Sequence, residues 1–146
     1  MKQQVFDPGR KEFSPYGFSC GVWQLQSMSR PDRHNEIELN FTDSSGFTYL
    51  FGGRRESVHR GKLALFWAAT PHQIIEYPVK SSYYVVTIPL AWFLGWKLPR
   101  VFTEAVLNGT ILEQPDESMC SIDIQLFTRW VNDFDAVSSE LHELIA

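Results

Sequence analysis

The residues with the clearest chemical potential share one face of a predicted strand over 34–42. Alternation along this strand gathers polar side chains on that face, namely His34, Glu36, Glu38 and Asn40. The opposite face is apolar, with Ile37, Leu39 and Phe41. Because an unpaired charge is costly to bury, the polar face must either meet water or line a polar cavity.

A metal ion is one ligand that this face could bind. His72 follows Pro71 at the start of another predicted strand, and imidazole and carboxylate groups together suit a divalent transition metal. His34 and Glu38 lie about 13 Å apart along an extended strand. They could therefore share an ion only if the strand bends and the Glu38 side chain reaches back. The pattern alone leaves open that these polar residues are satisfied internally or lie on the surface.

The elements that would position these residues are short strands. Their composition and the breaks between them predict strands over 17–28, 34–42, 47–51, 54–59, 62–67, 72–77 and 83–88. Gly52 and Gly53 suit a tight hairpin turn between two of them. Strands at this spacing, without helices between them, predict an antiparallel sandwich or barrel.

After Pro89 the pattern becomes helical. We expect one or two helical turns over 90–96, a helix over 100–108 that ends at Gly109, and a helix from Asp123. The last of these carries an apolar stripe of Leu126, Phe127, Trp130, Val131 and Phe134. A second helix is expected to start at Ser138 or Ser139. The stripe could cover the apolar face of the 34–42 strand from outside, which would turn the polar face inward toward a ligand.

Composition narrows the class of protein. The chain has 146 residues and a formal net charge of −4, which predicts one domain that does not itself grip nucleic acid. It lacks an apolar run of the length that spans a membrane, about 18 residues or more, and the sequence begins without a signal peptide. Cys20 and Cys120 form no metal or disulfide motif, so we expect thiols in a reducing cytoplasm.

Three segments carry a family resemblance: His34-Asn-Glu-Ile-Glu-Leu-Asn, then Leu65-Phe-Trp-Ala-Ala-Thr-Pro-His-Gln73, then Phe93-Leu-x-Trp96-x-Leu98. Together with Gly52-Gly53 they resemble the two motifs of a cupin barrel. More narrowly, the stretch 30–99 resembles the N-terminal sensor domain of AraC-type transcription regulators. The 65–73 segment is the specific part of this resemblance, whereas the rest is shared by cupins in general.

The resemblance implies a mainly-β fold, in which a cupin-like antiparallel β-barrel of jelly-roll type is followed by C-terminal α-helices. We expect an N-terminal arm over 1–16, the ligand-sensing barrel over 17–113, and a shortened helical dimerisation segment over 114–146. The helix-turn-helix DNA-binding domain of such regulators is expected to be absent from this chain. The implied protein is a cytoplasmic homodimer that binds a small-molecule effector, with a sugar as the expected class, and contacts DNA only through the absent domain.

The resemblance also implies site residues. The expected ligand-binding residues are Arg30, His34, Glu38, Trp67, His72 and Tyr84. The metal-binding cupin motif would place ligands at His34, Glu38 and His72, with Asp32 as an oxygen ligand where the motif has histidine. Sensors of this family mostly bind an organic ligand without a metal, so no cofactor is expected, while a divalent metal remains an alternative.

Other roles stay open for three of these residues. Arg30 could instead pair with Asp32 at the surface, and Trp67 could belong to the core. Tyr84 alternates with Tyr83, and the pattern does not say which of the two points inward. At the level of function, the leading hypothesis is a non-enzymatic sensor. The alternatives are a stand-alone metal-dependent cupin enzyme, an isomerase or oxygenase, and a dimerisation module whose barrel is filled by its own side chains.

Overall fold

The computed structural model describes residues 3–145, without the side chains of 138–139 and 141–145; Met1 and Lys2 of the expected arm and Ala146 of the expected helical segment lie outside it. The strands are β1 (Gln3–Gln4), β2 (Ser19–Gln24), β3 (Glu36–Phe41), β4 (Phe47–Phe51), β5 (Arg54–Val58), β6 (Ala64–Trp67), β7 (His72–Glu76), β8 (Ser82–Pro89) and β9 (Leu112–Glu113). The helices are α1 (Leu90–Gly95), α2 (Arg100–Leu107) and α3 (Cys120–Ile145).

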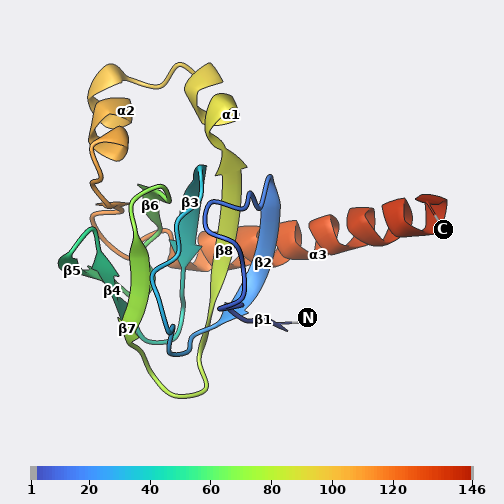
Figure 1. Ribbon diagram of the computed structural model, residues 1–146, viewed down its shortest axis with the longest axis horizontal. Helices are drawn as coiled ribbons and strands as arrows, with labels where there is room; N and C mark the ends of the chain where they lie inside the picture. The colour runs from blue at the N-terminus through green and yellow to red at the C-terminus, as the bar shows by residue number, and fades with distance from the viewer. Residues whose placement is uncertain (1–2, 146) are drawn as a thin grey trace.

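The strands form two sheets that lie face to face (Figure 1). The larger has six strands in the order β1-β2-β8-β3-β6-β9, and the smaller has three in the order β5-β4-β7. All neighbours pair antiparallel except β1 and β2, which are parallel. The predicted mainly-β fold with C-terminal helices is therefore confirmed.

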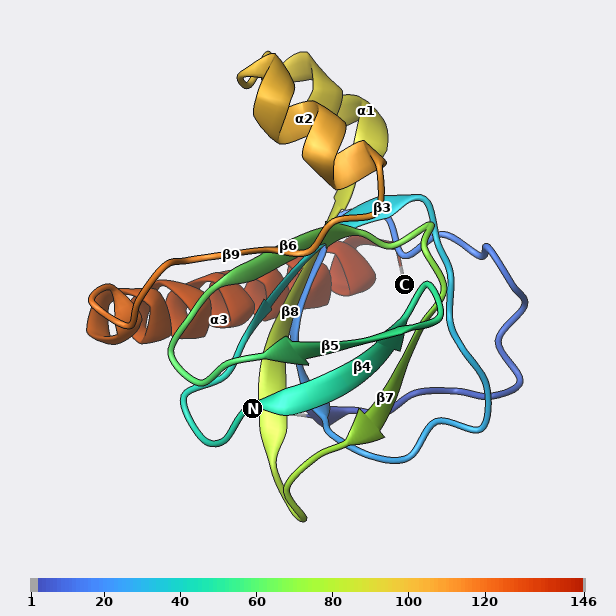
Figure 2. The ribbon, with the colours of Figure 1, turned by 90° about the vertical axis from the view of Figure 1, so that its left-hand side faces the viewer.

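The expected barrel of jelly-roll type takes the form of a two-sheet sandwich and is not closed. Strand pairing within the described residues does not continue from one sheet into the other, and an isolated bridge between Asp32 and His72 joins the segment before β3 to β7. The fold is thus a sandwich of two sheets, with the smaller sheet lying over one face of the larger (Figure 2).

Each face of the larger sheet has its own apolar cluster. Between the sheets the largest buried side chains include Tyr49, Phe51, Phe66 and Tyr83. On the outer face the cluster includes Ile37, Phe41, Val86, Phe127 and Val131. Burying one such side chain contributes about 1.5–3 kcal/mol, so both faces help to hold the fold together.

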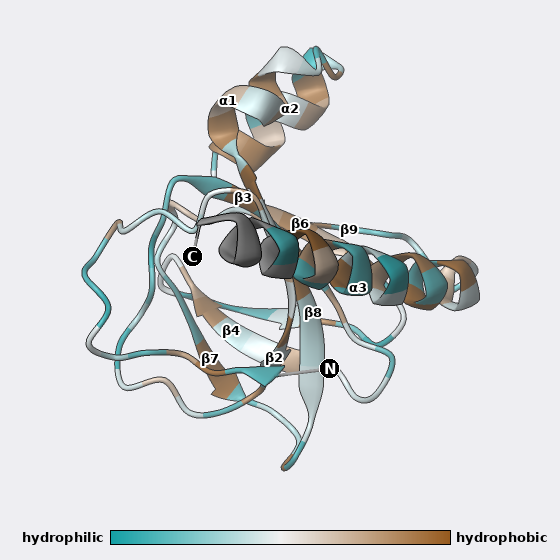
Figure 3. Ribbon diagram, turned by 90° about the vertical axis from the view of Figure 1, so that its right-hand side faces the viewer, coloured by the Kyte–Doolittle hydropathy of each residue, from teal (hydrophilic) through white to brown (hydrophobic). Residues whose placement is uncertain are grey.

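Helix α3 crosses the outer face of the larger sheet (Figure 3). The Phe127 ring stacks on the Phe41 ring with centroids 5.4 Å apart and planes within 7° of parallel. The apolar reverse of β3 is therefore covered by Phe127 and Val131 of the C-terminal helix, which confirms the predicted stripe in part, since Leu126 and Trp130 of the same stripe are exposed. In the described part of the chain, none of the helices combines the length and apolar character needed to cross a bilayer.

The expected division of the C-terminal segment into two helices is wrong. A single helix starts at Cys120 and continues through Ser138 and Ser139 to Ile145. Serine favours helix starts but does not break a helix as proline does, so the residue types at 138 and 139 permit continuation. Asp123 is in the first turn, where its negative charge suits the helix dipole, rather than before it.

Two glycine predictions are confirmed. Gly52 and Gly53 have φ of 54° and 82° and connect β4 to β5, as a tight hairpin with both central residues at positive φ requires. Gly109 follows α2 with φ of 85°, the left-handed conformation that ends many helices.

Candidate ligand site between the sheets

A cavity of about 40 Å³ lies between the two sheets. Its polar wall is formed by Asp32, His34, Glu38 and His72. Aromatic side chains form much of the remaining wall, among them Tyr16, Trp23, Tyr49 and Tyr83. The polar face of β3 is therefore turned inward, and the predicted convergence of His34, Glu38 and His72 is observed.

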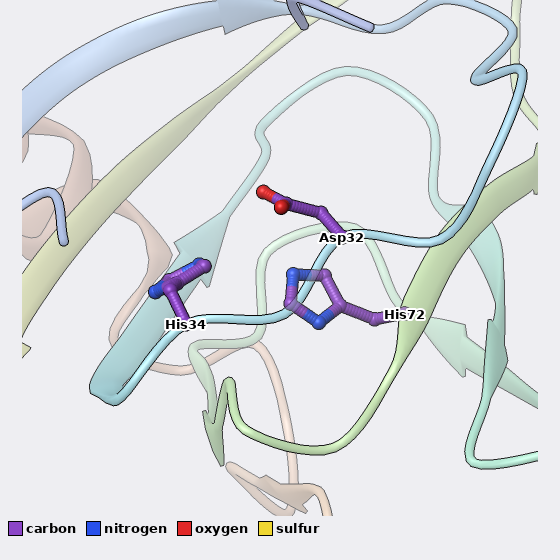
Figure 4. A group of neighbouring side chains, drawn as sticks. All are labelled: Asp32, His34 and His72. Atoms are coloured by element: carbon purple, nitrogen blue, oxygen red, sulfur yellow. The ribbon is translucent and has the colours of Figure 1, made fainter. Parts of the chain in front are cut away.

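Asp32 and His72 are held side by side by their own backbones. The Asp32 amide donates to the His72 carbonyl over 2.9 Å, and the His72 amide donates to the Asp32 carbonyl over 3.1 Å. His72 opens β7 directly after Pro71, whose carbonyl accepts from the Gly52 amide over 2.9 Å. Both side chains therefore start from fixed backbone positions and project into the same space (Figure 4).

The chain bends between His34 and Glu38, as it must if the two side chains are to approach one another. β3 begins only at Glu36, and His34 lies before it with its amide bound to the Ala68 carbonyl over 3.0 Å. Its ring Nε2 is 3.1 Å from Glu38 Oε2, far closer than an extended strand would allow. The two groups form a buried ion pair whose side chains are 2% and 6% exposed.

His34 lies between two carboxylates. Burial lowers the pKa of its imidazole, but Glu36 and Glu38 outweigh burial and raise the pKa to about 9. Burial likewise raises the pKa of each carboxyl, yet the neighbouring His34 ring holds both below their usual range. The ring is therefore an imidazolium at neutral pH. Its Nδ1 is 3.2 Å from Glu36 Oε1 but is not aligned for a hydrogen bond with it.

His72 has the opposite character. Burial lowers the pKa of its ring, and the nearby Glu38 carboxylate only partly offsets this. Nδ1 lies 2.9 Å from the Thr70 carbonyl oxygen, which can only accept, so the proton belongs on Nδ1. Nε2 is then an acceptor inside the cavity, 3.7 Å from the Glu38 carboxylate.

A chain of two hydrogen bonds fixes the Glu38 carboxylate through its Oε1 atom. The Tyr49 hydroxyl donates to Asn40 Oδ1 over 2.5 Å, and Asn40 Nδ2 donates to Glu38 Oε1 over 3.0 Å. All three side chains are buried, and burial raises the pKa of the Tyr49 hydroxyl, so it stays a donor. Glu38 is therefore held in one orientation, with Oε2 left toward the two histidines.

The N-terminal arm closes the other side of the cavity. Tyr16 donates its backbone amide to Glu36 Oε1 over 2.8 Å and its hydroxyl to Asp32 Oδ2 over 3.2 Å. Arg10 pairs with Asp32 Oδ1 over 2.7 Å. Sequence reasoning missed both residues. In the sequence, these two residues belong to a polar N-terminal segment interrupted by prolines, a composition that fits an arm lying over another part of the protein.

Three expected site residues are not in the cavity, and those expectations are corrected. The Arg30 guanidinium binds backbone carbonyls of Pro8, Arg10 and Pro31, so it anchors the arm and does not pair with Asp32 either. Trp67 packs on the outer face because Phe66, its neighbour in β6, takes the inward position.

Tyr84 also faces outward. Its ring packs on Phe127 and its hydroxyl lies 3.2 Å from Thr128 Oγ1 of α3, while Tyr83 faces the cavity. Strand alternation fixes this result once α3 covers the outer face, because only one of two consecutive residues can point inward.

The polar wall has donors that suit a divalent metal. One ligand atom each from Asp32, His34 and His72 lies within 4.8 Å of the others, and all three residues are buried. Two imidazoles and a carboxylate are a common donor set for zinc and related ions, with bonds near 2.0–2.2 Å. The group includes Asp32, which was expected as an additional oxygen ligand, and it does not include the expected Glu38, although Glu38 lies next to both rings.

These features define a small sandwich domain with a partly open cavity that has one polar wall, an architecture suited to small-molecule binding. The chain is 22% identical over 112 residues to the melibiose operon regulatory protein of Escherichia coli K12, and equally to that of Escherichia coli O6:H1. The alignment covers 76% of this chain and 36% of each relative, so the chain spans about a third of the length of the curated relatives it matches. No protein-family model matches the chain. The similarity supports a relationship to AraC-type regulators, and the relatives are regulators rather than enzymes.

Proposed function

We propose that this chain is the ligand-sensing part of an AraC-type transcription regulator, and that it is not an enzyme. The main support is the cavity between the sheets, into which His34, Glu38 and His72 converge, in a chain similar to an operon regulator. A small molecule bound there would control an attached DNA-binding domain. The free thiols Cys20 and Cys120 suit action in the cytoplasm.

A sugar is the ligand class expected from the family resemblance. Sugar hydroxyls need oriented donors and acceptors, which the carboxylates and imidazoles of the polar wall supply. Their C–H faces pack on aromatic rings, and Trp23, Tyr49 and Tyr83 line the cavity. Both kinds of contact are thus available in one place.

The arm links ligand binding to the rest of the protein. A volume of 40 Å³ holds about three waters, which is too little for a hexose. Arg10, Tyr16 and Phe6 of the arm contact or line the same cavity. Movement of the arm would provide the extra room that a sugar-sized ligand needs, and it would couple occupancy of the cavity to the position of residues 3–16.

Helix α3 suits dimerisation with a second copy of the chain. Ile122, Leu126 and Trp130 recur every fourth residue and are 49%, 38% and 42% exposed. Such a row can pack against its own equivalent across a two-fold axis. DNA binding is assigned to a further domain, because the net charge of −4 disfavours phosphate contact by this one.

Thermal denaturation in the presence of mono- and disaccharides tests the sensing proposal. A ligand at 100 times its dissociation constant should stabilise the chain by about 2.7 kcal/mol. Glu38→Gln should abolish that stabilisation, whereas Glu117→Gln, on the exposed surface, should preserve it. A broad screen that shifts no transition in folded protein would contradict the proposal.

A metal-bound form is the second candidate, favoured by the grouping of Asp32, His34 and His72. These residues would hold the ion, and the ion would supply Lewis-acid chemistry to a metal-dependent isomerase or oxygenase. Elemental analysis of protein purified without added metal separates the two candidates. About one equivalent of a transition metal supports this one, and less than about a tenth of an equivalent removes it.

A further inference from the structure

The charges around the cavity restrict the chemical class of the ligand more than the volume of the cavity does. We propose that the cavity binds a hydroxylated organic cation, such as an amino sugar, whose ammonium group takes the place of the Arg10 guanidinium beside Asp32. This inference rests on the proposed ligand-binding role of the cavity. The similarity to a melibiose regulator does not by itself indicate a cationic effector.

The arm already places a cation in the site. The Arg10 side chain is only 11% exposed, its Nη1 pairs with Asp32 Oδ1, and its guanidinium lies 3.9 Å from the centre of the Tyr16 ring. A carboxylate beside an aromatic face is a favourable environment for ammonium and guanidinium groups. Arg10 thus marks a cation subsite beside Asp32 and Tyr16, two residues of the cavity wall.

Arg10 fills this subsite imperfectly. Its Nη2 is buried and has no hydrogen-bond partner. A buried donor without an acceptor is unfavourable, so burial of the Arg10 guanidinium stabilises the site less than burial of a fully paired cation would. A ligand whose N–H groups are all paired can therefore compete with Arg10 for Asp32.

Negative charge predominates around the cavity. Asp32, Glu36 and Glu38 are 4%, 3% and 5% exposed, and they face two cations, Arg10 and His34. Three carboxyl groups thus face one guanidinium and one imidazole, and displacement of Arg10 would leave them with the imidazole alone. Because buried charge must be compensated, the site favours a cation and disfavours an anion such as a uronate or a phosphorylated sugar.

Hydrogen-bond acceptors also predominate. The Nδ1–H group of His72 donates a hydrogen bond to the Thr70 carbonyl, so Nε2 presents a lone pair toward Glu38 Oε2 at 3.7 Å. Two acceptors at this distance repel each other unless a donor lies between them. An ammonium or hydroxyl group of the ligand can donate to both, whereas an acetylated amine has fewer donors and no charge.

Matched hexoses test the charge directly on the wild-type chain. Calorimetric titration at pH 7 and constant ionic strength should give affinities at least about tenfold tighter for glucosamine or galactosamine than for glucose, galactose or the N-acetyl derivatives, the difference expected from one charge-assisted contact. Glucuronate should not bind. Equal or tighter binding of the neutral sugars would overturn the cation inference and leave the sensing proposal intact. No binding by any compound would count against both.

Chemical complementation tests the subsite without requiring the natural ligand. Arg10→Ala should bind methylguanidinium saturably and recover lost thermal stability, with an affinity at least about tenfold above that of the wild type. Asp32→Asn in the same background should abolish the effect. Arg33→Ala is the matched control, because Arg33 pairs with Glu12 of the arm over 2.7 Å, away from the cavity.

If Arg10→Ala fails to fold, Arg10→Met can be used instead, because methionine keeps a long apolar side chain in place of the aliphatic part of arginine. A folded Arg10 variant that does not bind methylguanidinium would overturn the inference. Recovery of thermal stability by methylguanidinium to the same extent in Arg33→Ala would overturn it as well. Trypsin cleavage after Lys11, an exposed arm residue, provides a wild-type readout. Saturating amino sugar should accelerate it several-fold if the ligand displaces the arm, and unchanged cleavage despite binding would contradict displacement of Arg10.

Discussion

The two faces of the six-stranded sheet show how one set of strands can serve two purposes. Along β3, Ile37 and Phe41 build a tightly packed outer face beneath α3, while Glu36 and Glu38 build a charged inner face. The outer face is apolar and its aromatic rings stack, so it contributes stability. The inner face adds buried charged groups to its apolar cluster, and Arg10 Nη2 and His34 Nδ1 there have no hydrogen-bond partner, which suits a ligand rather than close packing.

This contrast predicts that substitutions on the two faces have different consequences. Outer-face changes should lower the free energy of unfolding and leave the affinity of a folded chain for its ligand unchanged. Inner-face changes should mainly alter the affinity for the ligand and the pH dependence of stability, and these changes should be large compared with the change in the free energy of unfolding.

The largest effect is expected on the outer face. Phe127→Ala removes the ring that stacks on Phe41 and should lower the free energy of unfolding by about 3–5 kcal/mol. Urea denaturation followed by tryptophan fluorescence measures this. Gln125→Ala, at an exposed position of the same helix outside its apolar row, should change it by less than about 1 kcal/mol. Comparable losses in both variants would show that α3 does not seal the sheet.

The pH dependence of stability should come from the inner face. The pKa of His34 is about 9 in the folded chain, above the usual value of 6.5. Its protonated form therefore stabilises the fold fully below about pH 6.5, and this contribution is lost as pH rises through 9, by about 3 kcal/mol. Glu36 and Glu38 have lowered pKa values, so their contribution is lost instead as pH falls below their usual range.

Urea denaturation at pH 6.5 and pH 9.5 measures the His34 contribution. His34→Gln should flatten the decline between these two values, whereas His59→Gln, whose ring is 60% exposed, should retain it. A wild-type stability that is the same at both pH values would contradict the buried imidazolium.

Two tyrosines permit a balanced comparison of the faces. Tyr49→Phe removes the donor to Asn40 behind Glu38, and Tyr84→Phe removes a hydrogen bond to Thr128 on the outer face. Each should cost about 1 kcal/mol of stability. Only Tyr49→Phe should also weaken ligand binding, because Glu38 loses its fixed orientation. Calorimetry that shows equal weakening in both variants would remove the distinction between the faces.

The smallest effect on stability is expected at Arg30. Arg30→Ala removes contacts to arm carbonyls at the surface and should lower the free energy of unfolding by less than about 1 kcal/mol. It should nevertheless speed cleavage of the arm by trypsin, because the anchor is lost. Lys80→Ala is a remote control. An unchanged cleavage rate in Arg30→Ala would show that Arg30 does not hold the arm.

The contrast between the faces was partly predictable from sequence. Alternation along 34–42 assigned Glu36 and Glu38 to one face and Phe41 to the other, because the strand period is independent of tertiary structure. The bend at His34 was not predictable, since it depends on a hydrogen bond to Ala68, which is distant in sequence. The choice between Tyr83 and Tyr84 depended on where α3 would pack.

The arm was the least predictable part of the site. Sequence reasoning placed Arg30 near the ligand, whereas Arg10 reaches Asp32 and Arg30 holds the arm backbone. Both are arginines in polar segments, and only the path of the chain decides which one enters the cavity. The continuous α3 was missed because Ser138 and Ser139 are residue types that often start helices, although they do not interrupt one.

Histidine side-chain NMR offers the most direct test that the charged inner face encloses a ligand site. During titration with the hexose panel, the imidazole resonances of His34 and His72 should shift together and saturate, while those of exposed His59 stay unchanged. Shifts confined to His59, or an unresponsive His34 and His72 when calorimetry shows binding, would place the ligand elsewhere and contradict the account.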